Sequence, residues 1–469
     1  MNKSGEPYRE DDLTIAWSVV VSVFSIGGML GSLIAGFLAD LLGRRLFMFI
    51  LAIGGVLSGI ILGISKIAES LAVLIIGRFF VGFVSGAYTG LVPMYLMEVA
   101  PQDIRGSIGV FNQFSIVCAL LISQALGLYE VLGNENGWPL LFGLTAVPAA
   151  VQVLFVLFIC PESPRYLLIT KNNEQAARDV LNQVISNADE TDAAITEMKE
   201  EAEALERELK VGIYDFVKRA ELRFPILIAI VMQLSQQFSG INGIFYYSKT
   251  LFIKSGIDEG TAEYATLGVG ATMIVTTAIS IPLMERLGRK ILHCTGIGGM
   301  FTAAVLVTVF LAIRDQYSWA GTVGVVFSLV FVMFFAIGPG SIPWIITSEL
   351  FTQGARPGAI AIATFVNWSA NFVVGMTFEP LINVIDQYVF VIFAVLLLGF
   401  LFFTIFFVPE TKGKSFQEIQ RQFVSPNYQS TVSSSVNIPG SNNNNNNNNS
   451  SNFDNNNDSN IKFETTPKE

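Results

Sequence analysis

Long apolar stretches, separated by short polar turns, occupy most of the first 408 residues. A helix that crosses the hydrocarbon core of a bilayer needs about 20 consecutive, mostly apolar residues. Eleven stretches meet that requirement: residues 15–39, 46–65, 71–97, 106–128, 138–160, 224–247, 264–284, 291–313, 319–347, 358–379 and 388–408. The pattern therefore predicts an all-α integral membrane protein with eleven transmembrane helices.

Two polar segments interrupt or follow this pattern. Within residues 161–223, the stretch 174–210 is rich in helix formers with Ala and Leu at helical intervals, which predicts short amphipathic helices on the membrane surface. From Val424 the composition shifts to Ser, Thr and an Asn tract, which predicts a disordered tail. The predicted organisation is a short acidic tail over 1–12, a five-helix bundle over 13–160, a linker over 161–223, a six-helix bundle over 224–408 and a tail over 409–469.

Composition agrees with the membrane prediction. Hydrophobic residues make up 52% of the chain and charged residues 14%, whereas about 25% of a soluble domain is charged. The net charge of −10 argues against a nucleic-acid partner, which requires cations for its phosphates. Cys118, Cys160, Cys294 and His293 stand far apart or in apolar runs, so we expect neither a disulfide framework nor a metal site. The sequence has no phosphate-binding loop and no nucleophile beside a base, so we expect neither an enzyme nor a cofactor.

Three charged signatures each occur twice, about 250 residues apart, which indicates two parallel repeats with a ligand site near the midplane between them. They are Asp40-x-x-Gly43-Arg44-Arg45 with Glu285-x-x-Gly288-Arg289-Lys290, Glu98 and Arg105 with Glu349 and Arg356, and Pro161-Glu162-Ser163 with Pro409-Glu410-Thr411. Two predicted spans precede the second Gly-Arg turn, but one precedes the first. By internal symmetry we expect the chain to lack the first helix of a twelve-helix design.

Of the 28 Lys and Arg residues, 21 lie on the side of the membrane that carries these signatures, many of them in the segment 161–223. The positive-inside rule then predicts that those turns and the C-terminus are cytoplasmic and that the N-terminus is outside. This rule alone explains cations at helix ends, but acids recur beside them in both halves. Exposed ion pairs contribute about 0–1 kcal/mol each, so a network of them is weak enough to break and re-form as a switch.

Uncharged amides gather on three of the predicted spans. The residues are Gln113 and Gln124 on 106–128, Gln233, Gln236, Gln237 and Asn242 on 224–247, and Asn367 and Asn371 on 358–379. A lone amide in a membrane helix commonly bonds a neighbouring helix, but so many together predict a polar cavity. Amides both donate and accept hydrogen bonds, and Trp344 offers a face for an apolar ring surface, so a neutral polyol fits better than an ion.

Two spans carry residues that weaken a helix. Gly338-Pro339-Gly340-Ser341-Ile342-Pro343-Trp344 interrupts span 319–347, as either a passive kink or a hinge. Gly240 and Gly243 flank Asn242, and they predict a loosened helix that turns backbone toward the cavity.

These motifs resemble those of the sugar porters of the major facilitator superfamily, in particular the animal-type facilitative glucose transporters. The resemblance runs from about Leu13 to Phe423. It rests on GRR at 43–45, GRFFVG at 77–82, EVAPQDIRG at 98–106, PESPRYLL at 161–168, QLSQQFSGINGIFYYS at 233–248, GPGSIPW at 338–344, NWSANF at 367–372 and PETKG at 409–413.

The resemblance implies a fold of two pseudo-symmetric helical bundles and transport of a glucose-like hexose by alternating access, at the plasma membrane. It implies sugar contacts from Gln113, Gln236, Gln237, Asn242, Trp344 and Asn371, with Ile116 and Phe335 lining the cavity. Tyr246 and Tyr247 would form part of an outer gate. A cytoplasmic salt-bridge gate would be formed by Glu98, Arg105, Glu162, Arg165, Glu285, Arg289, Glu349 and Arg356.

This sequence departs from the family pattern in three ways. By the resemblance we expect the family's first helix to be absent, and Met273 and Ala336 stand where glucose carriers have an asparagine and a glutamate. Each lost hydrogen bond is worth about 0.5–1.5 kcal/mol, so we expect weaker glucose binding or a preference for another hexose. The acids lie at or near the ends of the spans, which favours passive facilitation over proton coupling. The alternatives are a proton-coupled symporter with a restored first helix, a sugar sensor, and a truncated product that does not transport.

Overall fold

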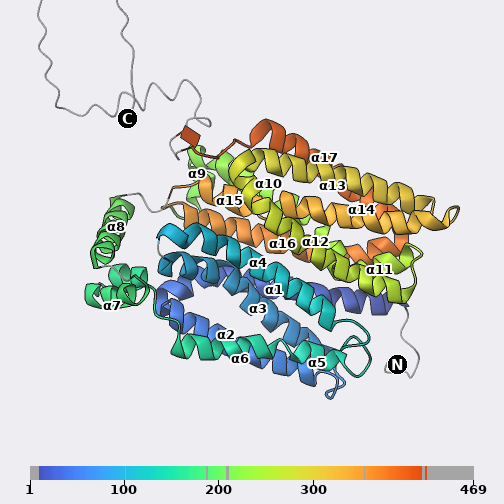
Figure 1. The fold of residues 1–469 in the computed structure, drawn as a ribbon, viewed down its shortest axis with the longest axis horizontal. Coiled ribbons are helices and arrows are strands. Elements are labelled where there is room, and N and C mark those ends of the chain that lie inside the picture. The colour runs from blue at the N-terminus through green and yellow to red at the C-terminus, as the bar shows by residue number, and fades with distance from the viewer. Residues whose placement is uncertain are drawn as a thin grey trace, which may run out of the picture. The chain divides into compact units, whose positions relative to one another are not determined.

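The structure is a computed structural model that describes residues 10–100, 102–185, 188–207, 211–352, 354–414 and 418–419. Side chains at several further positions, among them Arg105 and Glu285, are outside the described residues, as is the tail predicted to be disordered. In Figure 1 the long helices run side by side along the horizontal direction, and the helices labelled α7 and α8 lie apart from them at one end. The helices of the N-terminal half are α1 (Glu10–Leu42), α2 (Arg44–Ile64), α3 (Leu71–Val99), α4 (Gln102–Leu126), α5 (Trp138–Gly143) and α6 (Ala146–Phe158).

The C-terminal half follows a linker. The linker contains a π-helical turn, η1 (Tyr166–Thr170), and the helices α7 (Glu174–Val184), α8 (Ala188–Arg207) and α9 (Asp215–Lys218). The C-terminal half contains α10 (Ala220–Gln237), α11 (Ile241–Lys254), α12 (Glu259–Leu287), α13 (Arg289–Ala312), α14 (Ser318–Ile337), α15 (Ile342–Glu349), α16 (Arg356–Ile385), the 3-10 turn η2 (Asp386–Tyr388) and α17 (Val389–Phe407).

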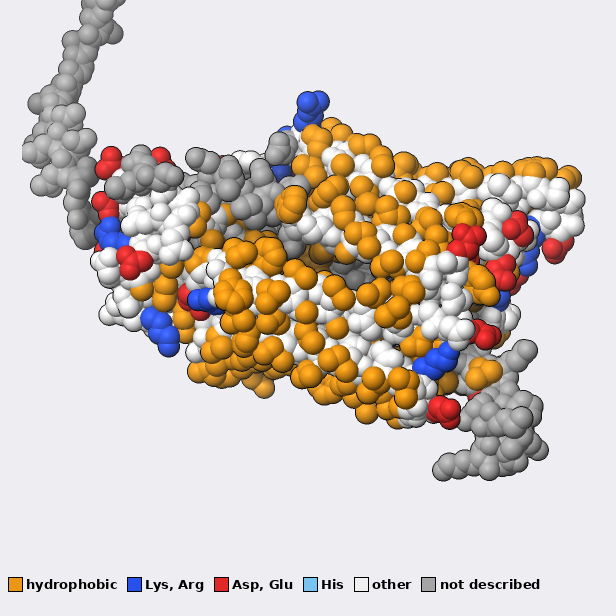
Figure 2. All heavy atoms as spheres, turned by 60° about the horizontal axis from the view of Figure 1, so that its bottom comes forward, with side chains coloured by type: hydrophobic (Ala, Val, Ile, Leu, Met, Phe, Trp, Pro, Cys, Tyr) orange, Lys and Arg blue, Asp and Glu red, His pale blue; other side chains and the backbone are white. Residues whose placement is uncertain are grey.

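Each of the eleven predicted spans is formed by one helix or by two consecutive helices. Ten segments of the described chain are long and apolar enough to cross a membrane, and Phe111–Leu126 of α4 supplies a shorter apolar helix. Figure 2 shows apolar side chains over the middle of one face, with charged side chains gathered toward its two ends. Within the described residues, one spanning helix precedes Gly43, whereas α10–α11 and α12 precede Gly288, so the predicted asymmetry between the halves is present.

The breaks predicted inside two spans are confirmed. The first of these spans is divided between α10 and α11, where Gly240 adopts a left-handed backbone with φ of 89°. The second is divided between α14 and α15 over residues 338–341. Each break leaves main-chain groups without their helical partners at membrane depth, so these groups require other partners.

Two glycine turns show the internal repeat in the backbone. Gly43 and Gly288 have φ values of 91° and 90°, a region that favours glycine. A Cβ atom at either position would lie 2.6 Å from a carboxylate oxygen, of Glu162 and Glu410 respectively. We call the end of the bundle that carries these turns the linker end. The opposite end, with the turns at 65–70, 127–137 and 255–258, is the far end.

The two halves meet along two helix pairs, α1 with α16 and α4 with α12. The largest apolar core lies in the C-terminal half, around fully buried Phe252, Phe331, Phe378 and Phe390. The linker has a small core of its own, in which Leu168, Ala177, Leu181, Ile195 and Met198 pack together. Helices α7 and α8 lie where short amphipathic helices are predicted, and each contributes buried apolar residues to this core.

Candidate functional site

The amides of the C-terminal half converge on one buried cluster. Gln233, Gln236 and Gln237 occupy the last turns of α10, Asn242 lies in the first turn of α11, and Asn367 and Asn371 lie on α16. Their exposed fractions run from 0% for Gln233 to 8% for Asn242. The break at Gly240 allows α10 and α11 to present amides from both sides of the break to α16. We call these six residues the amide cluster.

Asn367 is at the centre of the hydrogen bonding. Its Nδ2 donates to Oε1 of Gln233 at 2.8 Å and to Oε1 of Gln236 at 2.6 Å. Its Oδ1 accepts a hydrogen bond from Nε2 of Gln237 at 2.9 Å. One side chain of α16 therefore holds three side chains of α10 in place.

Gln237 connects the network to Asn242 on α11 and to Asn371 on α16. Its Oε1 accepts hydrogen bonds from Nδ2 of Asn242 and, at 3.3 Å, from Nδ2 of Asn371. Amide groups buried in an apolar interior require such partners, because an unpaired one costs about 1–3 kcal/mol. Nε2 of Gln233 has no hydrogen-bond partner among the described residues although it is buried, so the cluster retains a free donor.

Gln236 connects the cluster to the break between α14 and α15. Its Nε2 donates to the carbonyl oxygens of Pro339 at 2.8 Å and Gly340 at 2.7 Å. Helix interruption leaves these carbonyls available, and the Gln236 side chain satisfies them. The break between α14 and α15 is therefore hydrogen-bonded directly to the amide cluster through Gln236.

The N-terminal half reaches the cluster through α1. The Ser25 hydroxyl donates to Oδ1 of Asn371 at 2.5 Å, and the Tyr246 hydroxyl donates to the same oxygen at 3.2 Å. Trp368 lies against Gly28 of α1, where a Cβ would come within 2.6 Å of the indole ring. Asn371 thus joins groups from both halves, and α1 has room for this contact because residue 28 has no side chain.

The remaining predicted contact residues take no part in the hydrogen bonds of the cluster. Gln113 is half-buried on α4, Trp344 is half-buried on α15, and Ile116 is 56% exposed. In the part of the chain that the structure describes, no hydrogen bond joins Gln113 or Trp344 to the amides. Phe335 is buried on α14, with its ring centroid 6.1 Å from that of Phe245.

The two predicted gate tyrosines, Tyr246 and Tyr247, both contact α16, and the contact of Tyr246 with Asn371 is given above. Tyr247 donates its hydroxyl to the carbonyl oxygen of Gly375 at 3.2 Å and stacks on Phe378. Its backbone departs from helical geometry, with φ of −127°, so α11 is kinked beside Tyr246. Both tyrosines therefore connect α11 to α16 immediately beyond the amides.

The linker end of the N-terminal half carries a charge network centred on Arg44. Its Nε and Nη2 donate to the two oxygens of Glu98 at 2.9 and 3.0 Å, and its Nη1 lies 3.1 Å from Asp40. The Glu162 carboxylate accepts the backbone N–H groups of Arg44 at 2.9 Å and Arg45 at 3.1 Å. Glu162 therefore caps the first turn of α2, whose N–H groups have no intrahelical acceptors.

The C-terminal half repeats this arrangement. Arg289 donates to Oε1 of Glu349 at 3.2 and 3.0 Å, and Glu410 accepts the backbone N–H groups of Arg289 and Lys290 at 2.9 and 3.1 Å. Partial burial raises the pKa of Glu410, but its backbone hydrogen bonds, including those from Thr411 and Lys412, outweigh burial and leave the pKa below its ordinary value. Glu410 therefore stays ionised as the cap of α13.

The other predicted gate residues are placed differently. Arg165 forms an ion pair of 2.7 Å with Glu201 of α8, and Nη2 of Arg356 lies 3.4 Å from the carbonyl oxygen of Phe351. The side chains of Arg105 and Glu285 are outside the described residues. The Arg44–Glu98 and Arg289–Glu349 pairs each lie within one half, so neither of them joins the halves.

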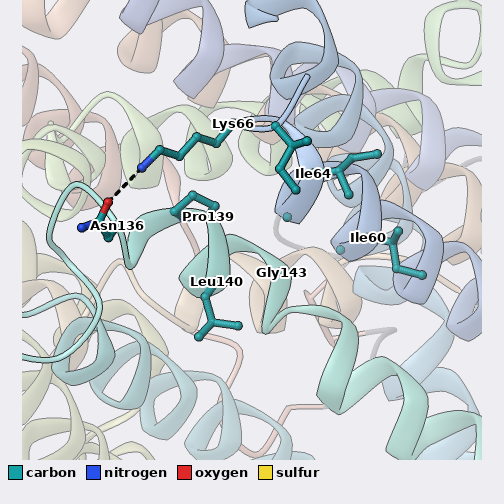
Figure 3. A pocket seen from close by; sticks show the side chains of 10 residues that line it. Ile60, Ile64, Lys66, Asn136, Pro139, Leu140 and Gly143 are labelled. Carbon is teal, nitrogen blue, oxygen red and sulfur yellow. Dashed lines mark hydrogen bonds between the residues drawn. The ribbon is translucent and has the colours of Figure 1, made fainter. Parts of the chain in front are cut away.

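A separate groove lies between α2 and α5 at the far end. It has a volume of about 560 Å³ and is lined by Ile60, Ile64, Pro139 and Leu140 among others. Figure 3 shows these side chains together with Lys66, whose Nζ lies 3.4 Å from Oδ1 of Asn136. The groove shares no residue with the amide cluster and opens on helices that do not contribute to it.

Comparison with known proteins assigns this architecture to a family. The family model described as "Sugar (and other) transporter" matches residues 1–423. The chain belongs to the sugar transporter family. Its fold is that of the major facilitator superfamily sugar porters, and it is a multi-pass membrane protein.

Relatives within the sugar transporter family match most of the chain. Facilitated glucose transporter member 1 of solute carrier family 2 from Gallus gallus is 46% identical over 418 residues, which are 89% of this chain and 84% of the relative. Member 3 from Rattus norvegicus is 44% identical over 430 residues, or 92% of this chain and 86% of the relative.

Solved structures in the family have the same fold. The inward open conformation of the xylose transporter XylE from E. coli matches with a TM-score of 0.74 and 25% identity, over 89% of this chain and 92% of that structure. The proton:xylose symporter XylE bound to 6-bromo-6-deoxy-D-glucose matches with a TM-score of 0.69 and 26% identity, over 89% and 91% of the two chains.

Sequence reasoning placed all six amides of the cluster at the predicted polar cavity, but it did not name Gln233 and Asn367 as sugar contacts and did not name Ser25. Gln233 and Asn367 carry a signal, because each lies three or four residues from an assigned contact on the same helix. Ser25 carries none, since a serine in a membrane helix commonly bonds its own backbone. The two apolar departures, Met273 and Ala336, are buried in the core of the C-terminal half, each 4% exposed.

Proposed function

We propose that this chain is a facilitative carrier of a hexose that works by alternating access, with the amide cluster as its sugar site. The observation that carries the proposal is the cluster itself: six amides buried in an apolar interior, hydrogen-bonded to one another across α10, α11 and α16. Polar groups at membrane depth usually face a pathway or a ligand.

The chemistry of the cluster favours a neutral sugar. An amide both donates and accepts, as a hydroxyl does, so each amide pair can exchange its internal hydrogen bond for two bonds to one sugar hydroxyl. The unpaired Nε2 of Gln233 provides a donor without any exchange. No carboxylate or cation takes part in the hydrogen bonds of the cluster given above, which disfavours an ionic substrate. The glucose transporter relatives support the hexose assignment.

Alternating access assigns distinct roles to the two ends. We place the linker end in the cytoplasm, because its turns carry Arg44, Arg45, Arg289 and Lys290. The Ser25–Asn371 contact between α1 and α16 closes the route toward the far end, beside Tyr246 and Tyr247. The charge networks at the linker end hold helix ends together within each half, so each half can rock as a unit.

Transport of radiolabelled D-glucose into proteoliposomes tests the proposal. Gln237→Ala removes the side chain that joins Asn242, Asn367 and Asn371, and it should raise the half-saturation concentration about tenfold. The matched control is Gln316→Ala, which changes an exposed glutamine in the turn before α14. Exchange that is equally fast and equally saturable in both variants would show that the amide cluster is not the sugar site.

Proton-coupled transport is the second candidate, and Glu379 is the residue that favours it. This acid is half-buried on α16, and its Oε2 is enclosed without a hydrogen-bond partner among the described residues. Accumulation of sugar against its gradient, driven by an inward proton gradient and abolished by Glu379→Gln, would establish coupling. Facilitated transport predicts equal final sugar concentrations on the two sides at any pH gradient.

A further inference from the structure

A second set of contacts joins the halves at the far end, outside the amide cluster. It lies where the chain leaves α4 and where α12 begins. Glu263, in the second turn of α12, is its centre, and its side chain is 15% exposed although it lies at a helix end. Glu259, one turn earlier on the same helix, is 72% exposed.

The two oxygens of Glu263 have partners in different halves of the molecule. Oε1 lies 2.5 Å from Nζ of Lys249, which belongs to α11 of the same half. Oε2 accepts the backbone N–H of Tyr129 at 3.1 Å, and Tyr129 follows α4 in the N-terminal half. Beside this contact the Tyr264 hydroxyl donates to Oε2 of Glu130 at 3.4 Å, again from one half to the other.

This contact differs from an ordinary surface ion pair. Tyr129 N–H lies just past the end of α4, and among the described residues its acceptor is Glu263 rather than a carbonyl of its own turn. Hydrogen bonds from a backbone N–H to a carboxylate are among the stronger ones in proteins. Lys249 keeps the carboxylate charged and turned toward Tyr129, and Glu259, 2.8 Å from Nζ, supports Lys249 from the exposed side.

Helix α11 connects this contact to the amide cluster. Asn242, Tyr246 and Lys249 all belong to that helix, with Lys249 beyond the kink at Tyr247. Asn242 donates a hydrogen bond to Gln237, and the Tyr246 hydroxyl donates one to Asn371. A shift of α11 that follows sugar binding therefore moves Lys249 and the carboxylate that it holds.

We propose that Glu263, positioned by Lys249, is a gate residue that closes the far end by holding the backbone of Tyr129 and must release it each time the far end opens. This inference rests on the proposed alternating-access function. Glu263 does not touch the sugar in this scheme. It acts on the balance between the two access states, and Lys249 acts through Glu263.

The first test measures access and requires no transport. Ser22 of α1 is 1% exposed and lies between the halves, 3.1 Å from the position of a Cβ at Gly375. In a chain whose three native cysteines are serines, Ser22→Cys should react slowly with a membrane-impermeant maleimide added from the far side. Adding Glu263→Ala or Lys249→Met should speed labelling about tenfold, as expected for the loss of one charge-assisted hydrogen bond.

Two further variants separate a gate from a mere structural pair. Glu259→Gln removes the other partner of Lys249 without touching the N-terminal half, and it should leave labelling unchanged. The exchanged pair Lys249→Glu with Glu263→Lys restores an ion pair between α11 and α12 but offers no acceptor to Tyr129, so labelling should stay fast. Normal protection in the exchanged pair, or unchanged protection in Glu263→Ala, would overturn the proposal.

Transport kinetics provide the second readout. In Glu263→Ala the half-saturation concentration for entry from the far side should fall, while that for exit from the linker side should rise, because the balance of access states shifts. A structural defect alone would lower both maximal rates without opposite changes in half-saturation. A chain that labels as expected but moves no hexose would refute the proposed function and leave the gate standing.

Discussion

Asn367 provides the sharpest test of how the amide cluster is organised. Its side chain makes three hydrogen bonds, to Gln233, Gln236 and Gln237. Asn367→Ala removes all three and leaves their partners buried. Each such bond is worth about 0.5–1.5 kcal/mol net, and we expect the three freed glutamines to recover part of the loss among themselves. A net loss of about 1–3 kcal/mol corresponds to a half-saturation concentration raised about 5- to 150-fold.

The measurement is D-glucose exchange in proteoliposomes over a range of sugar concentrations, with the melting temperature in detergent as a check on folding. Asn383→Ala is the matched control, because Asn383 also lies on α16 and accepts a hydrogen bond from Lys254 at 2.7 Å, but at the far end. The reasoning fails if half-saturation for Asn367→Ala stays within twofold of the unmodified chain, or if Asn383→Ala changes it equally.

Three further predictions concern the repeated turns and the helix break. Gly288→Ala forces a side chain into a backbone with φ of 90° and against the Glu410 carboxylate, so it should destabilise the fold by about 1–3 kcal/mol. Gly413→Ala, where a Cβ meets open space, should destabilise the fold less. Thermal unfolding of the two variants compares these effects. Glu410→Gln should lower the melting temperature at pH 7, and the difference should shrink only as the pH falls below 4.5, the ordinary pKa of the group, because a carboxylate whose pKa is depressed on folding stabilises only where it is ionised. Gln236→Leu should slow transport by leaving the carbonyls of Pro339 and Gly340 unpaired, and Gln236→Glu, which replaces the donor with an acceptor, should be at least as slow.

Much of the fold followed from the sequence because membrane helices are specified by local pattern. A run of about 20 apolar residues has few alternatives in lipid, so the eleven spans were predictable one at a time. The breaks at Gly240 and at 338–341 were predictable for the same reason, because glycine and proline act on the backbone where they stand.

The site was less predictable, because it depends on which side chains meet. The amides on α10, α11 and α16 were identifiable from composition, but their pairing depends on the helix crossing that brings Asn367 to Gln237. Ser25 and Glu263 gave no local signal of their contacts with the other half. The partner of Arg165 proved to be Glu201, on a linker helix whose packing no motif specifies.

The self-bonded state of the amide cluster has a consequence for how tightly any cargo is held. On the proposal that the cluster is the sugar site, most of its polar groups already have partners, so a sugar gains only the difference between its own hydrogen bonds and those it displaces. The proposal therefore predicts modest affinity and fast release. On the same proposal, internal hydrogen bonding keeps the amides paired while the unloaded carrier returns, so that step requires no water to pair them inside the bilayer.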